Sequence, residues 1–165
     1  MIEKIKNGVF GLVLLSMLVF VSCLEGIEPP EQILPWETEQ FETDQNLIKK
    51  YLDENNISYL ADTTYGLKYV LLDSGNETRP NYNSDVTVNY AGWILGDTVN
   101  FDAGDSVTFP LNRLIPGWIV LMPYMGVGGT MEMYIPSSMA YGTRGAGSIP
   151  PNSNLVFRID LLDVD

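Results

Sequence analysis

The chain has 165 residues, which is enough for one compact domain with short appendages. Its formal net charge of −12 argues against a nucleic-acid partner, because such binding depends on Lys and Arg neutralising phosphates. The sequence contains no histidine and a single cysteine, Cys23, which excludes a His-dependent triad, a His metal site and an internal disulfide. We therefore predict neither a metal site nor a cofactor.

The first 22 residues are predicted to be a secretion signal. Two lysines precede an apolar run over residues 9–21, which is too short to span a membrane comfortably. The sequence Val21-Ser22-Cys23 resembles the bacterial lipobox, in which the cysteine becomes the lipidated first residue of the mature protein. We therefore favour a bacterial lipoprotein that is anchored to a membrane through Cys23 and faces the periplasm or the cell surface. The alternatives are a plain signal peptide with an incidental cysteine, or an uncleaved N-terminal anchor.

Two short segments are predicted between the signal and the domain. Residues 23–43 are acidic, contain three prolines and show no sustained apolar period, which predicts a tether. Residues 24–43 are expected to be dispensable for folding and isomerisation. Acidic residues close behind Cys23 resemble the surface-export signal of some Bacteroidetes lipoproteins, although a solvated acidic linker explains them equally well. Residues 44–63 are predicted to form a short helix, capped by Asp44 and running through Asn55, and a linker. This helix would either pack on the domain through an apolar stripe or act as a spacer.

The remaining residues, 64–165, are predicted to form one α+β domain. Alternating apolar residues indicate strands over residues 65–75, 85–95, 131–135 and 154–164. In the third of these strands, Met133 is expected in the core and Tyr134 on the opposite face. Residues 119–125 are predicted to form the single short helix, shortened or distorted by Pro123. The pattern favours a curved antiparallel sheet of five to six strands wrapped over this helix.

Several motifs agree in order and spacing with one known family. They are VNYAG, FD, FPLNRLIPGW, IPSSMAYG and IPPNSNLVF, and they lie between Val88 and Phe157. From Thr64 to the C-terminus the chain resembles the FKBP-type peptidyl-prolyl isomerases, the macrolide-binding immunophilins. The resemblance implies an FKBP-like fold and an isomerase, or rotamase, that assists the folding of exported proteins by binding proline-containing segments. It also implies macrolides as inhibitors.

The chemistry of such an enzyme needs an apolar pocket more than a nucleophile. Rotation about a peptide bond faces a barrier of about 18–20 kcal/mol, and X-Pro bonds interconvert slowly. Twisting the amide breaks its conjugation and reduces its charge separation, so an apolar pocket disfavours the planar ground state more than the twisted transition state. A few fixed dipoles would then complete the site.

The resemblance implies a role for ten residues of this chain. The catalytic residues would be Tyr90, Asp102 and Tyr141, with Tyr141 donating a hydrogen bond to the carbonyl before proline and Asp102 interacting with the twisting amide. Trp118 would lie under the proline ring, and the backbone amide of Ile115 would hold a second carbonyl. The full set of substrate-binding residues would be Phe101, Phe109, Leu114, Ile115, Trp118, Ile149 and Phe157. Taken singly, most of these side chains would be ordinary core residues, so their joint order carries the assignment.

The chain departs from the family's usual pattern near the acid. Residues 103–108, predicted to be a loop, contain no arginine that could pair with Asp102. Asp102 is therefore expected to rely on Tyr90 or water. This departure and the unusual Pro123 keep a second hypothesis open, in which an FKBP-like module binds proline-containing or apolar segments as a chaperone with weak or no catalysis.

Overall fold

The computed structural model describes residues 38–165 of the protein. The predicted signal sequence, the predicted lipidation site Cys23 and the predicted tether up to residue 37 lie outside the described residues. No helix in the described part of the chain is long and apolar enough to cross a membrane.

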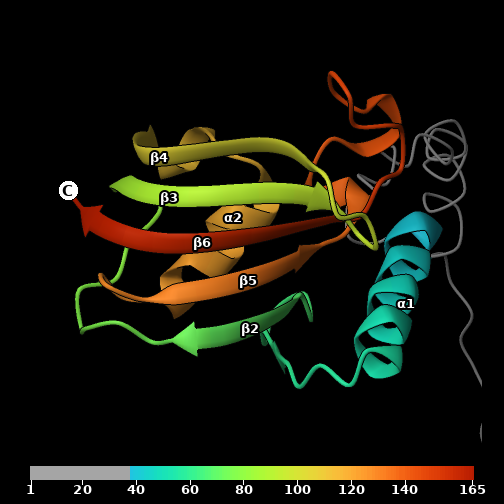
Figure 1. The fold of residues 1–165 in the computed structure, drawn as a ribbon, viewed down its shortest axis with the longest axis horizontal. Helices are drawn as coiled ribbons and strands as arrows, with labels where there is room; N and C mark the ends of the chain where they lie inside the picture. Colours follow the sequence, from blue (N-terminus) through green and yellow to red (C-terminus); the bar gives the residue numbers. More distant parts are fainter. Residues whose placement is uncertain (1–37) are drawn as a thin grey trace, which may run out of the picture. The chain divides into compact units, whose positions relative to one another are not determined.

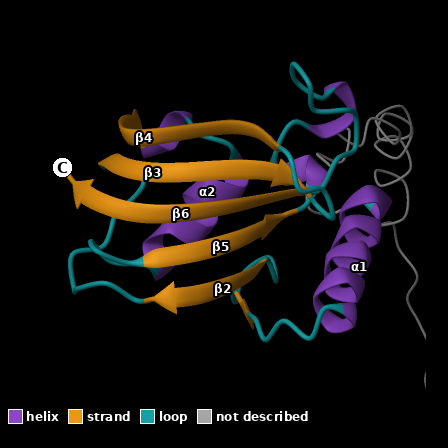
Figure 2. Cartoon of the chain, in the orientation of Figure 1, coloured by secondary structure: helices purple, strands orange, loops and turns teal. Residues whose placement is uncertain are grey.

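A six-stranded antiparallel sheet forms the centre of the domain (Figure 1), in the order β1-β2-β5-β6-β3-β4. The strands are β1 (Leu60–Ala61), β2 (Lys68–Asp73), β3 (Asp85–Ile94), β4 (Asn100–Pro110), β5 (Thr130–Ile135) and β6 (Leu155–Val164). The short helix α2 (Pro116–Leu121) lies across one face of this sheet (Figure 2). The predicted α+β class, with five to six antiparallel strands over one short helix, is therefore confirmed.

Alternation along the strands builds the core between the sheet and α2. The inward side chains of β6, which include Phe157 and Ile159, are at most 4% exposed. Met131 and Met133 of β5 are fully buried in the same cluster, as predicted. Because successive residues of a strand point to opposite faces, the period of two in the sequence was sufficient to identify these core positions.

Helix α2 begins and ends three to four residues earlier than predicted. The sequence suggested residues 119–125, but the helix starts at Pro116 and ends at Leu121, and Met122–Tyr124 form a 3₁₀ turn. Proline is favourable at the first helical position because the amide hydrogen it lacks would have no partner there anyway. Pro123 has no N–H to donate to a carbonyl one turn back, so the α-helical pattern cannot pass through it.

The N-terminal helix α1 (Glu39–Glu54) is longer than predicted. Its cap is Thr38, whose Oγ1 accepts a hydrogen bond from the backbone N–H of Phe41 at 3.1 Å. The prediction that Asp44 caps the helix is therefore wrong, and residues 39–43 are helical and not part of a tether. Phe41 is 4% exposed and belongs to the main core cluster, so we no longer expect the whole of residues 24–43 to be dispensable.

Helix α1 packs on the domain instead of acting as a spacer. Ile48 and Leu52 are fully buried against Tyr134 of β5 and Val156 of β6. These two strand residues alternate with core residues that face α2, so α1 covers part of the opposite face of the sheet. The prediction that Tyr134 lies on that opposite face is confirmed, and the helix leaves it only 2% exposed.

Residues 103–108, predicted to be a loop, belong to strand β4. The ladder between β3 and β4 continues past them but contains two irregularities. One places Asn89 opposite two residues of β4, where Ser106 adopts a positive φ of 53° and its N–H donates to Asn89 Oδ1 at 2.8 Å. The acidic and glycine-containing sequence hid this strand, because bulges interrupt the alternation on which strand prediction depends.

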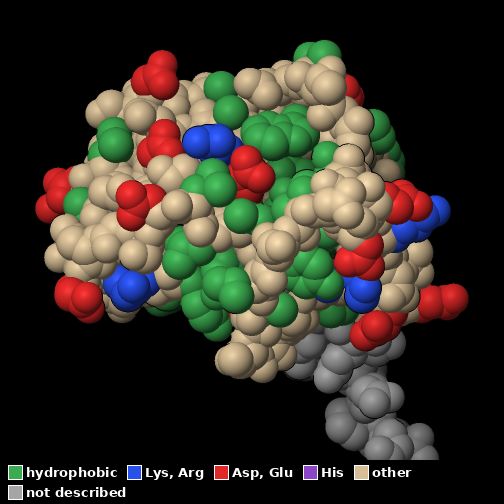
Figure 3. Space-filling model, turned by 60° about the horizontal axis from the view of Figure 1, so that its bottom comes forward, with side chains coloured by type: hydrophobic (Ala, Val, Ile, Leu, Met, Phe, Trp, Pro, Cys, Tyr) green, Lys and Arg blue, Asp and Glu red, His purple; other side chains and the backbone are tan. Residues whose placement is uncertain are grey.

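Large exposed apolar side chains are scattered over different elements. They are Leu47, Leu60, Leu72, Tyr82, Val99, Tyr141 and Leu162. On the face drawn in Figure 3, apolar side chains gather across the middle, with an acidic and a basic side chain among them, and other Asp and Glu side chains lie towards the edges. Single exposed apolar side chains on different elements, such as the seven named above, are ordinary on the surface of a folded domain.

Candidate functional site

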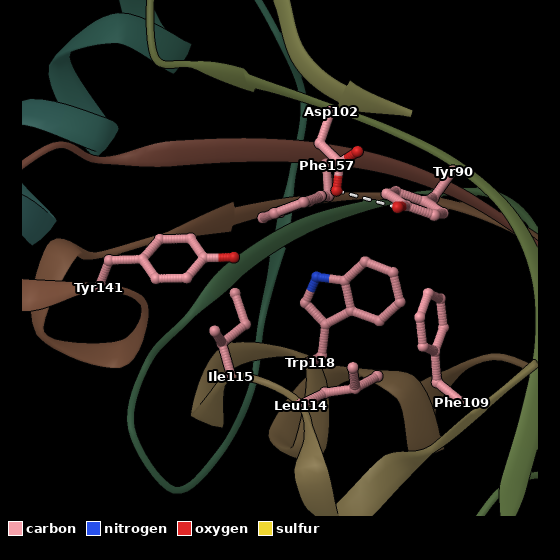
Figure 4. Close-up of a pocket in the computed structure, with 8 residues that line it drawn as sticks. All are labelled: Tyr90, Asp102, Phe109, Leu114, Ile115, Trp118, Tyr141 and Phe157. Atoms are coloured by element: carbon pink, nitrogen blue, oxygen red, sulfur yellow. Dashed lines mark hydrogen bonds between the residues drawn. The ribbon is translucent and has the colours of Figure 1, made fainter. Parts of the chain in front are cut away.

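A pocket of about 180 Å³ opens between the sheet and the segment that leads into α2. Its lining consists of Tyr90, Asp102, Phe109, Leu114, Ile115, Trp118, Tyr141 and Phe157, all of which are drawn in Figure 4. The residues come from five parts of the chain: β3, β4, α2 with the two residues before it, the loop before β6, and β6 itself. All eight were candidate site residues in the sequence, and the fold brings them together.

Trp118 lies at the base of the pocket and is only 4% exposed. The rings of Tyr90, Phe109 and Phe157 meet it edge to face, at centroid distances of 5.8, 6.5 and 5.3 Å. Such T-shaped contacts are favourable and restrict the position of the indole ring. The pocket is therefore bounded by an aromatic cluster of fixed geometry.

A β-bulge turns the pair Phe101-Asp102 towards the pocket side of the sheet. Asp102 pairs with Gly92 and Asn100 pairs with Trp93, so Phe101 is an extra residue in β4. A bulge of this kind lets two consecutive residues point to the same side. Phe101 packs against Phe157, with ring centroids 5.5 Å apart, while Asp102 lines the pocket.

Asp102 is held by Tyr90 of the neighbouring strand, on the sheet side of the pocket (Figure 4). The Tyr90 hydroxyl donates a hydrogen bond to Asp102 Oδ2 at 2.9 Å, which answers the question raised by the missing arginine. Burial and this hydrogen bond to Asp102 raise the pKa of Tyr90 to about 12. Tyr90 is therefore a neutral donor at physiological pH, and its hydroxyl orients the carboxylate.

Tyr141 enters the pocket from the long loop between β5 and β6. Its side chain points towards the pocket and is 38% exposed, so the hydroxyl is within reach of a bound molecule (Figure 4). Burial, followed by the nearby charge of Asp102, raises the pKa of Tyr141 above its ordinary value. The pocket thus contains two neutral phenols and one carboxylate among apolar side chains.

Two of the ten predicted site residues do not line the pocket. Phe101 packs against Phe157, as described above, and Ile149 is 7% exposed and belongs to the core cluster. Phe101 therefore contributes to the pocket through its contact with Phe157, whereas Ile149 is a core residue.

Sequence reasoning gave no role to two glycines that the pocket requires. A Cβ atom on Gly92 would lie 2.6 Å from the ring of Phe157 and 2.7 Å from that of Phe101. A Cβ atom on Gly104 would lie 2.7 Å from the ring of Tyr90. Glycine inside a strand commonly marks such a close approach, and this signal could have found Gly92, whereas Gly104 lies in the segment that was predicted to be a loop.

The geometry agrees with comparisons to known proteins. A family model described as FKBP-type peptidyl-prolyl cis-trans isomerase matches residues 76–162, more than half of the chain. The chain belongs to this family. The match covers β3, β4, α2, β5 and most of β6, and with them every residue that lines the pocket.

Individual relatives support the same assignment. The chain is 41% identical over 121 residues to the FKBP-type 22 kDa peptidyl-prolyl cis-trans isomerase of Escherichia coli, a match that covers 70% of this chain and 58% of that protein. It is 39% identical over 104 residues to the outer membrane protein MIP of Legionella longbeachae, covering 60% and 44% of the two chains. A solved peptidyl-prolyl cis-trans isomerase from Pseudomonas syringae pv. tomato matches with a TM-score of 0.65 and 29% identity, over 75% of this chain and 95% of that one. The chain thus spans about half the length of the Escherichia coli and Legionella longbeachae proteins.

Proposed function

We propose that this protein is a peptidyl-prolyl cis-trans isomerase that acts on proline-containing polypeptide segments. The observation that carries the proposal is the aromatic pocket over Trp118, which contains one carboxylate and two neutral phenols. Membership of the FKBP-type family supports it. The match to a solved peptidyl-prolyl cis-trans isomerase, which covers 95% of that chain, supports it as well.

The proposed mechanism is binding that favours the twisted amide. Trp118 supports the proline ring, and the surrounding rings exclude water from the peptide bond. In this apolar environment the planar amide, with its larger charge separation, loses more solvation than the twisted amide does. The barrier of about 18–20 kcal/mol is lowered without a covalent intermediate.

The polar groups of the pocket then have distinct roles. The Tyr141 hydroxyl donates a hydrogen bond to the carbonyl that precedes proline, and the Ile115 backbone amide holds a second carbonyl. Asp102, oriented by Tyr90, faces the amide as it twists. Phe101 acts as a support for Phe157 in the apolar lining, and Ile149 is a core residue. Macrolide inhibitors are expected to compete for the same apolar surface.

Catalysis and simple binding can be separated in one experiment. The test measures isomerisation of a proline-containing peptide by the wild-type protein and by the Asp102→Ala, Tyr141→Phe double variant, and binding of the same peptide to both. We expect the wild type to accelerate isomerisation well above the double variant. If both bind the peptide and neither accelerates it more than the other, the chain is a binding module and not an enzyme.

We also propose that the protein is an anchored lipoprotein that assists exported proteins. The lipobox-like sequence ending at Cys23 supports an anchor, residues 1–22 being the signal and the segment after Cys23 a tether. The name of the Legionella relative, an outer membrane protein, is in keeping with a location outside the cytoplasm. Mass spectrometry of protein extracted from membranes should find a diacylated Cys23 as the first residue. An intact residue 1 or an unmodified Cys23 would overturn the lipoprotein proposal.

A further inference from the structure

A buried carboxylate outside the pocket connects α1 to the loop that carries Tyr141. Asp44 is fully buried in α1. Its Oδ1 accepts a hydrogen bond from Gln40 Nε2 at 2.7 Å, and its Oδ2 accepts two from Ser137, from the backbone N–H at 2.9 Å and from Oγ at 2.6 Å. Burying a carboxylate is unfavourable unless hydrogen bonds compensate for the lost water. Asp44 therefore holds Ser137 tightly against α1.

Ser137 lies at the start of the loop, and Asn154 lies at its end. The loop runs from Pro136, directly after β5, to Asn154, directly before β6. The Ser137 N–H also donates to Asn154 Oδ1 at 3.1 Å, and Asn154 is 7% exposed. The two ends of the loop are thus joined to each other and to Asp44 in one buried set of hydrogen bonds.

We propose that Asp44 is a positioning residue for Tyr141. The inference rests on the proposed function, since Tyr141 is the proposed hydrogen-bond donor to the substrate. Tyr141 follows Ser137 by four residues. Ser137 begins the 3₁₀ turn Ser137–Met139, and only Ala140 separates this turn from Tyr141. By fixing the first residue of this turn, Asp44 fixes where the phenol enters the pocket. Helix α1 precedes residues 76–162, so this support comes from outside the segment that the family model matches.

Another buried carboxylate provides a matched control. Asp62 is 4% exposed and accepts hydrogen bonds from the backbone N–H groups of Thr64, Tyr65 and Leu67, at 2.8 to 3.0 Å. Asp62 orders the connection between β1 and β2, and none of these hydrogen bonds goes to the loop that carries Tyr141. Asp62→Ala should therefore destabilise the domain without moving Tyr141.

The first test is hydrogen exchange measured by mass spectrometry on the full-length protein in detergent. In Asp44→Ala, peptides from residues 136–154 should exchange at least about tenfold faster than in the wild type, while peptides from β3 change no more than in Asp62→Ala. Asp44→Asn should largely restore protection, because its amide oxygen can still accept from Ser137. Ser137→Ala, which removes only the Oγ hydrogen bond, should have an intermediate effect. Equal exchange of the loop in Asp44→Ala and Asp62→Ala would overturn the proposal.

The second test is a double-mutant cycle on the isomerisation rate, under conditions where all variants are folded. We expect Asp44→Ala to lower kcat/KM by about two- to fivefold, a loss no larger than that of Tyr141→Phe. In the Tyr141→Phe background the same change should have little further effect, because the placement of a missing hydroxyl no longer matters. A full additional loss in that background would show that Asp44 affects the rate independently of Tyr141, and would overturn the positioning role.

The two tests keep this inference separate from the proposed function. If the wild-type protein does not accelerate isomerisation, the proposed function fails, and the exchange experiment alone decides whether Asp44 holds the loop. If isomerisation is fast and the loop exchanges equally in both aspartate variants, the function stands and the positioning role fails.

Discussion

The two polar sides of the pocket are held in place by different means. Tyr90 and Asp102 project from β3 and β4, which share a ladder of backbone hydrogen bonds, and a bulge sets the direction of Asp102. Tyr141 projects from a long loop whose ends are held by the side chains of Asp44 and Asn154. Many backbone hydrogen bonds hold Tyr90 and Asp102 in place, whereas a few side-chain hydrogen bonds hold the loop that carries Tyr141. The strand side should therefore be sensitive to added volume, and the loop side to the loss of single hydrogen bonds.

The largest effect is expected where the two sides meet, at Trp118. Trp118→Ala should lower the free energy of unfolding by about 3–5 kcal/mol, because it removes a large ring from a packed aromatic cluster. It should also abolish binding of a proline-containing peptide, which titration under folding conditions can measure. Trp93→Ala, on the face of the sheet that α1 covers, is the control and should leave peptide binding intact. Peptide binding by Trp118→Ala at wild-type strength would contradict the assigned role.

Added volume tests the strand side. Gly92→Ala should cost about 1–3 kcal/mol of stability, because the new methyl group must displace the rings of Phe101 and Phe157. The displaced Phe157 should also weaken peptide binding. Ala103→Ser, at an exposed position of β4, is the control and should change stability by less than about 0.5 kcal/mol. Denaturant unfolding of both variants measures the difference, and equal values would show that the strand side tolerates added volume.

Removal of the Tyr141 hydroxyl tests the loop side. Tyr141→Phe should raise the activation free energy of isomerisation by about 1 kcal/mol and so lower the rate several-fold, because one hydrogen bond to the substrate is lost. Its stability should hardly change, since Tyr141 is 38% exposed. Tyr82→Phe, at a tyrosine that is 58% exposed and does not line the pocket, should leave the rate unchanged. An unaltered rate in Tyr141→Phe would remove the loop from the mechanism.

The smallest effect is expected from pH. The chain has no histidine, and the pKa values of Tyr90 and Tyr141 lie above their ordinary value of 10, so the rate should be nearly flat between about pH 6 and 8. Because the folded state binds the Tyr90 proton more tightly than the unfolded state does, its contribution to stability is complete below pH 10 and is lost from pH 10 to about 12. Rates at pH 6–8 and unfolding up to pH 11 check both statements. A sigmoidal rate profile between pH 6 and 8 would contradict this account.

The sequence by itself determined the fold class, the core strands and the residues of the pocket. The period of two identified strands such as β6, and ordered motifs identified all eight lining residues, because both signals are local in the chain. The local signal failed where bulges interrupt alternation, as in residues 103–108, and at the ends of the helices. Only the tertiary structure decided three things: that Tyr90 is the partner of Asp102, that Gly92 leaves room for two rings, and that Asp44 is a buried anchor and not a helix cap. Each of these depends on residues far apart in the chain, and their contacts exist only after the sheet has formed.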